Sequence, residues 1–269
     1  MLQHLVPQVR QVRKELTEFF YRVCEVYCTD QLILELMQAR GYTDKAMFDT
    51  LKELGVFKVD YLSELTFLVS GVTNDQLKAW GLVNKEGTFI LGGRYVVPIK
   101  DINGNVVALV GWHPKGGSRK YVTTPTLGFS RDASFFNLDC FRLAWEKWNG
   151  TVYLVEGIFD TISLRSLGFA ALGMQGLEMS PIKTQILSRF GKVIAIPDND
   201  SSGRSVNPMT NKFSGKSSKF IWHIENEHVF VVLPDGVKDV DDFVKYYEAY
   251  DDLLACQNAR YLRKLHVED

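Results

Sequence analysis

Acidic side chains follow three separate apolar runs of this sequence. The run ending at Glu156 is followed by Gly157, the run KVIAIP leads to Asp198 and Asp200, and VFVVLP leads to further aspartates. In chain order the acids are Glu156, Asp160, Asp198, Asp200, Asp235, Asp239, Asp241 and Asp242. No histidine or cysteine accompanies them, and oxygen ligands with Asp-x-Asp spacing suit hard cations, so we expect Mg²⁺ or Mn²⁺ rather than zinc.

Carboxylates that lie close together repel each other and raise each other's pKa unless cations lie between them. Two divalent ions held in this way can activate a 3′-hydroxyl and stabilise a leaving pyrophosphate. A strand-end acid can also be a solvated loop residue or a helix cap, and for Asp235 or Asp239 alone we favour that interpretation. Glu156, Asp198 and Asp200 taken together favour a metal site.

Alternating strand and helix patterns would position these acids. From Thr151 onward, apolar runs at 151–156, 170–174, 192–197 and 229–234 alternate with helical patterns. Such runs predict a parallel sheet that is buried on both faces. Ligands of open parallel sheets bind at the carboxyl ends of the strands, which is where the acids follow.

The N-terminal part of the chain has a different pattern. Apolar residues recur at helical spacing over residues 8–38, Thr43 or Asp44 is an expected helix cap, and Asn74 is another. After residue 84 the pattern changes to short strands and turns, and IKDINGNVVAL predicts a hairpin because Asn-Gly supplies positive φ angles.

These patterns divide the chain into four predicted parts. They are a helical N-terminal region (1–83), a basic α+β subdomain (84–150), the domain that carries the acids (151–247) and a C-terminal helical tail (248–269). The expected fold class is α/β, with a parallel sheet flanked by helices, an N-terminal mixed α+β subdomain and a short C-terminal helical segment.

The overall charge gives no sign of nucleic-acid binding, since the net charge is −1. A local basic loop does: its cations and aromatic residues are Lys115, Arg119, Lys120, Tyr121, Phe129 and Arg131. Cations bind phosphates and aromatic rings stack on bases, although a solvated charged loop would look the same. No apolar run approaches the roughly 18 residues of a membrane span. The pair Cys24 and Cys28 has no partner ligands nearby, so we read it as ordinary thiols.

Three segments, LVEGIFD, IPDNDSSGR and DVDDFV, resemble the Toprim signature. Their order and spacing are most similar to bacterial DnaG-type primases. Upstream, GGRYVVPIKDINGNVVALVGW and RKYVTTPTLGFSRD extend the resemblance, which covers roughly Asn84 to Tyr247. The resemblance implies a Toprim-type sheet and two or more Mg²⁺ or Mn²⁺ ions, with no zinc in this chain.

The resemblance also implies roles for individual residues. The implied catalytic residues are Glu156, Asp198 and Asp200, and the implied metal ligands are these three with Asp160, Asp239 and Asp241. The implied contacts to template or nucleotide are Arg94, Arg119, Lys120, Arg131 and Arg204. Arg131 stands where the family usually has a lysine, which keeps the charge and changes the geometry.

The implied function is synthesis of RNA primers from NTPs on single-stranded DNA, with a replicative helicase as partner and no membrane. The location would be the cytoplasm of a bacterial or phage-infected cell. A Toprim nuclease that directs water at a phosphodiester is one alternative, and a non-catalytic DNA-binding replication module is another. A type IA topoisomerase is disfavoured because nothing resembles its additional domain with a nucleophilic tyrosine. The family's N-terminal zinc-binding domain has no counterpart in this sequence.

Overall fold

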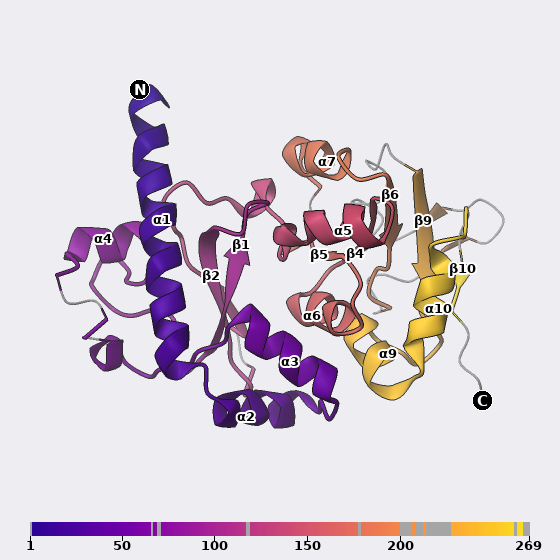
Figure 1. Cartoon of the computed structure of the whole chain (residues 1–269), viewed down its shortest axis with the longest axis horizontal. Helices are drawn as coiled ribbons and strands as arrows, with labels where there is room; N and C mark the ends of the chain where they lie inside the picture. The colour runs from indigo at the N-terminus through magenta and orange to yellow at the C-terminus, as the bar shows by residue number, and fades with distance from the viewer. Residues whose placement is uncertain are drawn as a thin grey trace. The chain divides into compact units, whose positions relative to one another are not determined.

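The structure is a computed structural model that describes residues 2–65, 67–68, 71–116, 119–176, 179–199, 206–207, 212–213, 227–260 and 263–265. It divides into two compact units, Met1–Ser130 and Arg131–Asp269 (Figure 1). The four-part division drawn from the sequence stays a prediction. Among the described residues, no helix combines the length and the apolar character that a membrane crossing requires.

The first unit begins with helices, three of which start at a side-chain N-cap. They are α1 (Leu2–Tyr27), α2 (Asp30–Arg40), α3 (Lys45–Leu54), the 3₁₀ helix η1 (Leu62–Leu65) and α4 (Asn74–Ala79). The segment expected as one helix over 8–38 is therefore two, because the Thr29 hydroxyl accepts from Leu32 N–H and starts α2. Of the two candidate caps before α3, Asp44 is the one used.

The predicted cap of α4 is wrong by one residue. Thr73, not Asn74, is the N-cap, and its hydroxyl accepts from the Gln76 N–H while the Gln76 side chain accepts from the Thr73 N–H. This reciprocal capping box satisfies two of the backbone donors that a helix start leaves unpaired, which a single Asn cap would not.

A small antiparallel sheet completes the first unit. Its strands β1 (Tyr95–Lys100), β2 (Val106–Trp112) and β3 (Tyr121–Thr123) lie in the order β1-β2-β3. The Asn-Gly turn joins β1 to β2 as expected, with Gly104 at φ 81°. Buried side chains of α1 and of both long strands form one core, so the helices and this sheet are a single packed body.

The second unit contains a parallel sheet in the order β10-β9-β6-β4-β5. Its strands are β4 (Thr151–Val155), β5 (Ala171–Gly173), β6 (Lys192–Ala195), β9 (Glu227–Val232) and β10 (Arg263–Lys264). The four predicted parallel strands are confirmed. The fifth, β10, lies in the segment expected to be helical, and it adds to the edge of the sheet beside β9.

Helices cover this sheet. They are α5 (Phe141–Lys147), α6 (Ile158–Ser166), α7 (Pro181–Leu187), α9 (Val240–Tyr246) and α10 (Ala249–Cys256), with the 3₁₀ turns η2 (Arg131–Ala133) and η3 (Leu138–Cys140). The Ser180 hydroxyl accepts from Lys183 N–H and caps α7, which Pro181 begins. Tyr247 has extended backbone and separates α9 from α10.

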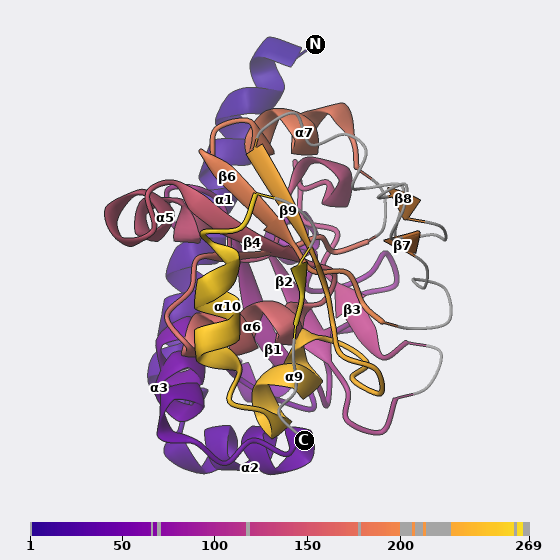
Figure 2. The same ribbon diagram turned by 90° about the vertical axis from the view of Figure 1, so that its right-hand side faces the viewer.

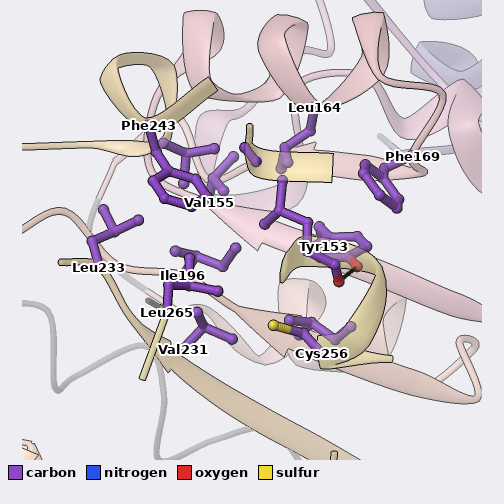
Figure 3. Packing of buried hydrophobic residues seen from close by; sticks show 14 of the residues in the cluster. Tyr153, Val155, Leu164, Phe169, Ile196, Val231, Leu233, Phe243, Cys256 and Leu265 are labelled. Carbon is purple, nitrogen blue, oxygen red and sulfur yellow. Dashed lines mark hydrogen bonds between the residues drawn. The ribbon is translucent and has the colours of Figure 1, made fainter. Parts of the chain in front are cut away.

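Helices α6, α9 and α10 lie against the sheet (Figure 2), and one buried cluster joins them to it. Tyr153 and Val155 of β4 pack there with Phe243 of α9, and the Tyr153 hydroxyl donates to the carbonyl of Leu253 in α10 (Figure 3). This packing holds the start of α9 near the carboxyl ends of the strands. The short strands β7 (Val206–Asn207) and β8 (Lys212–Phe213) pair with each other, and most of the residues around them lie outside the described part.

Candidate active site

Carboxylates gather at the carboxyl ends of three neighbouring strands. Glu156 follows β4, Asp198 follows β6, and a third group follows β9 at the start of α9. We call the acidic edge the set Glu156, Asp160, Asp198, Asp239, Asp241 and Asp242. The strand order puts β6 between β4 and β9, so acids that are far apart in sequence follow adjacent strands.

Hydrogen bonds tie these strand ends to one another. The backbone N–H of Asp198 donates to Glu156 Oε1 at 3.3 Å. The backbone N–H of Asp241 donates to Asp160 Oδ1 at 2.9 Å. Asn199, after β6, is linked to the segment before α9, because its backbone N–H donates to the Lys238 carbonyl at 2.6 Å. The carboxylates are therefore held by the backbone of neighbouring elements rather than displayed on free loops.

The electrostatics of the acidic edge favour a cation. Burial raises the pKa of Asp160 to about 7, and the nearby Asp239 charge adds to the shift. Burial also raises the pKa of Asp198 to about 8, with further repulsion from Asp160 and Glu156. Groups that repel one another in a buried place are the ones that a divalent cation would stabilise in their charged form. An oxygen-only donor set of this kind fits Mg²⁺ or Mn²⁺.

The first turn of α9 contributes a compact part of the acidic edge. One carboxylate oxygen each of Asp239, Asp241 and Asp242 lie within 4.8 Å of one another. Asp239 is the N-cap of α9, where its Oδ1 accepts from Asp242 N–H at 2.9 Å and its Oδ2 pairs with Lys238 at 3.1 Å. The resemblance does not imply Asp242 as a metal ligand, although its position three residues after a candidate helix cap in the sequence points to this turn.

Gly157 explains how Glu156 and Asp160 fit beside each other. A Cβ added to Gly157 would collide with Asp160 Oδ2, so the side chain of Asp160 lies against the bare backbone at the start of α6. The Thr161 hydroxyl donates to the Gly157 carbonyl at 2.8 Å and holds the same turn. The glycine after the strand is thus required by a close approach, since its φ is an ordinary −98°.

Asp241 differs from its neighbours in what surrounds it. Its residue is only 1% exposed. Its Oδ1 accepts from the Ser163 hydroxyl at 2.6 Å and its Oδ2 pairs with Lys245 at 2.5 Å. Neither Ser163 nor Lys245 was expected from the sequence, because both look like ordinary polar residues of a helix.

The predicted basic residues lie in both units. The structure divides the predicted basic loop, because β3 begins at Tyr121 and Arg131 lies in the second unit. We therefore keep the name basic loop for residues 113–121, of which 117–118 are outside the described part. Arg94 braces this loop, since its Nη1 donates to the carbonyls of Arg119 at 2.8 Å and Lys120 at 3.4 Å. Burial and the neighbouring Arg119 charge lower the Arg94 pKa. Arg94 therefore has a structural task, besides any contact it makes to a ligand.

The remaining cations are more exposed. Lys120 Nζ lies 5.6 Å from the ring centroid of the exposed Tyr121, which pairs a charge with a stacking surface. Arg131 begins η2 in the second unit and is exposed. Asp200 and Arg204, two further predicted site residues, lie outside the described residues.

Comparison with known proteins finds a match within the second unit. Residues 153–244 match the Toprim-like family. A DNA primase of Synechococcus elongatus is 30% identical over 166 residues, which is 60% of this chain and 24% of the relative. The chain therefore spans about a quarter of the length of that curated relative.

Solved structures extend the likeness to nearly the whole chain. The zinc-binding and RNA polymerase domains of the Aquifex aeolicus primase align with a TM-score of 0.71 and 22% identity, covering 92% of this chain and 61% of that one. A DnaG primase catalytic domain bound to ssDNA aligns with a TM-score of 0.69 and 17% identity, covering 93% and 80%. At such identities the likeness establishes the fold. Residues 153–244 thus resemble a Toprim-like domain, and the whole chain resembles the catalytic core of DnaG-type primases in sequence and in fold.

Proposed function

We propose that this chain is the catalytic core of a DNA primase, which joins ribonucleotides from NTPs into short RNA primers on a single-stranded DNA template. The observation that carries the proposal is the acidic edge. Half-buried and buried carboxylates gather at three adjacent strand ends, and the pKa values of Asp160 and Asp198 are raised. A protein that only binds DNA gains nothing from buried negative charge, whereas phosphoryl transfer requires bound cations.

The residues proposed to hold Mg²⁺ or Mn²⁺ are Glu156, Asp160, Asp198, Asp200 and Asp239. Asp241, the last of the ligands predicted from the sequence, has its carboxylate engaged by Ser163 and Lys245. The bound ions would supply charge stabilisation at the attacking and leaving oxygens. The chain's own task is to hold these carboxylates in place before substrate arrives, through the hydrogen bonds from the backbone of Asp198 and Asp241.

The proposed contacts to template and nucleotide are Arg94, Arg119, Lys120, Arg131 and Arg204. Lys120 and Tyr121 support this assignment, because an exposed cation beside an exposed ring can bind a phosphate and stack a base. The relative that is bound to ssDNA also supports DNA as a ligand. A replicative helicase as partner and a bacterial or phage-infected cytoplasm as location follow from the primase proposal and share its test.

Template-directed synthesis tests the proposal. The full chain is incubated with Mg²⁺ or Mn²⁺, labelled NTPs and a set of single-stranded templates that covers the possible trinucleotides. We expect short oligoribonucleotides that depend on template and metal. Folded protein that makes none on any template would contradict the proposal, and cleavage of labelled DNA without NTPs would show a nuclease instead.

A further inference from the structure

A buried polar contact at the acidic edge joins two helices of the second unit. The Ser163 hydroxyl of α6 donates to Asp241 Oδ1 at 2.6 Å, and Lys245 of α9 pairs with Asp241 Oδ2 at 2.5 Å. We call Ser163, Asp241 and Lys245 the α6–α9 clamp. Ser163 lies three residues after Asp160 in α6, and Lys245 lies four residues after Asp241 in α9, so each pair shares a helix face.

The clamp is buried to an unusual degree for an ion pair. The Asp241 side chain is 2% exposed and that of Lys245 is 9% exposed. Burying two charges costs desolvation energy, which their attraction repays only in good geometry, and an apolar pair of similar volume would often stabilise the fold as well. An ion pair in this place is therefore poorly explained by stability alone.

The clamp leads directly to the acidic edge. The same Asp241 whose side chain is clamped donates its backbone N–H to Asp160 Oδ1 at 2.9 Å. Asp239, two residues earlier, is the N-cap of the helix that the clamp holds against α6. Fixing Asp241 thus fixes the orientation of the Asp160 carboxylate and the start of α9, which carries Asp239.

We propose that Lys245 and Ser163 are positioning residues for the divalent-metal site and act through Asp241. Asp241 then orients Asp160 and Asp239 and is not itself a metal ligand. The inference rests on the metal site of the proposed function. Outer partners that orient metal ligands typically set metal affinity by about 10- to 100-fold. The clamp fits that description because Ser163 and Lys245 both contact Asp241, whose backbone N–H donates to the proposed ligand Asp160.

Metal binding by the full chain tests this inference without DNA or nucleotides. Isothermal titration with Mn²⁺ measures the affinity of the unaltered chain and of Lys245→Met, Lys245→Arg and Ser163→Ala. We expect Lys245→Met to weaken Mn²⁺ binding about tenfold or more. Lys245→Arg should restore most of the affinity because it keeps the charge. Ser163→Ala, which removes one hydrogen bond and no charge, should give a smaller loss in a chain that folds normally.

Lys192→Met is the matched control. Lys192 is a second buried lysine of the same unit, with its side chain also 9% exposed, and it donates to the carbonyls of Gln257 and Ala259. It begins β6, so it lies at the opposite end of that strand from Asp198. We expect Lys192→Met to lower the melting temperature and to leave Mn²⁺ affinity unchanged, which separates positioning from general stability.

Two outcomes would overturn the inference. One is Mn²⁺ affinity that is unchanged in both folded Lys245→Met and Ser163→Ala, and the other is an unaltered chain that binds no Mn²⁺. Primer synthesis assayed in parallel keeps the two proposals apart. Primer synthesis by the unaltered chain together with unchanged Mn²⁺ affinity in the variants would contradict the positioning role of the clamp and support the primase proposal. Weaker Mn²⁺ affinity in the variants of a chain that makes no primers would support the positioning role and contradict the primase proposal.

Discussion

The acidic edge and the basic loop place charge in opposite ways. At the acidic edge, Asp160 is 5% exposed and Asp241 is 1% exposed, and backbone or side-chain donors hold both carboxylates. At the basic loop, Lys120 and Tyr121 are exposed, and Arg94 donates to the backbone carbonyls of Arg119 and Lys120. The first arrangement fixes charge with geometry, whereas the second displays charge on a short surface segment.

This difference has an energetic cause. Buried carboxylates lose solvation and repel one another, so their site is destabilising until a cation binds. Exposed cations keep their hydration and cost the fold little, but they also specify little geometry. The comparison therefore predicts that changes at the acidic edge act on metal binding and chemistry, and that changes at the basic loop act weakly and on DNA affinity.

The largest effect is expected from Glu156→Gln, which keeps the shape of the side chain and removes its charge. Primer synthesis at saturating Mg²⁺ should fall by at least about 100-fold, since losing even an outer partner of a metal site costs about 10- to 100-fold. Single-stranded DNA binding should be retained. Glu146→Gln, at an exposed pair with Arg142, is the control and should be fully active. Nearly full primer synthesis by the Glu156→Gln chain would show that the Glu156 carboxylate takes no part in catalysis.

A smaller loss is expected from Gly157→Ala. The added Cβ collides with Asp160 Oδ2, so the carboxylate must move and Mn²⁺ affinity should fall by about tenfold. Gly191→Ala is the matched control, because a Cβ there meets nothing closer than 3.3 Å. Calorimetric titration of both variants checks the expectation, and equal affinities would mean that Asp160 is not placed by this close approach.

The pH dependence of stability follows from the raised pKa values. The folded pKa values of Asp160 and Asp198, about 7 and about 8, lie above the unfolded value of about 3.9. The folded state then holds extra protons, so metal-free stability falls as pH rises from about 4 to 8, by up to about 1.4 kcal/mol per pH unit for one group. Urea unfolding in EDTA should show a shallower fall for Asp198→Asn. An equal slope in both chains would contradict the raised pKa of Asp198, which burial causes first and repulsion from Asp160 and Glu156 second.

The smallest effect is expected at the basic loop. Lys120→Ala should weaken binding to single-stranded DNA a few-fold and lower the slope of log K against log salt by about 0.7, the value for one phosphate contact. Its free energy of unfolding should stay within about 0.5 kcal/mol of the unaltered chain. Lys85→Ala, at an exposed lysine of the same unit, is the control. Binding that does not distinguish the two variants would argue against a DNA contact at Lys120.

Much of the acidic edge could be predicted from local pattern. Glu156 and Asp198 end apolar runs, and the periodicity of those runs identified four parallel strands. Helix starts were harder, because Thr73 and Asn74 are both good caps and only the return bond from Gln76 selects Thr73. The break at Thr29 cannot be seen in the periodicity, because apolar residues continue at helical spacing across it.

By itself, the sequence determined which residues end strands and which helices carry acids, because these properties depend on neighbours within a few positions. The tertiary structure decided which ends are adjacent: β6 lies between β4 and β9, and β10 closes the edge. It also decided that Asp241 and Lys245, a pair at ordinary helical spacing, are buried against Ser163. Burial and strand order depend on packing between distant segments, and no local pattern records that packing.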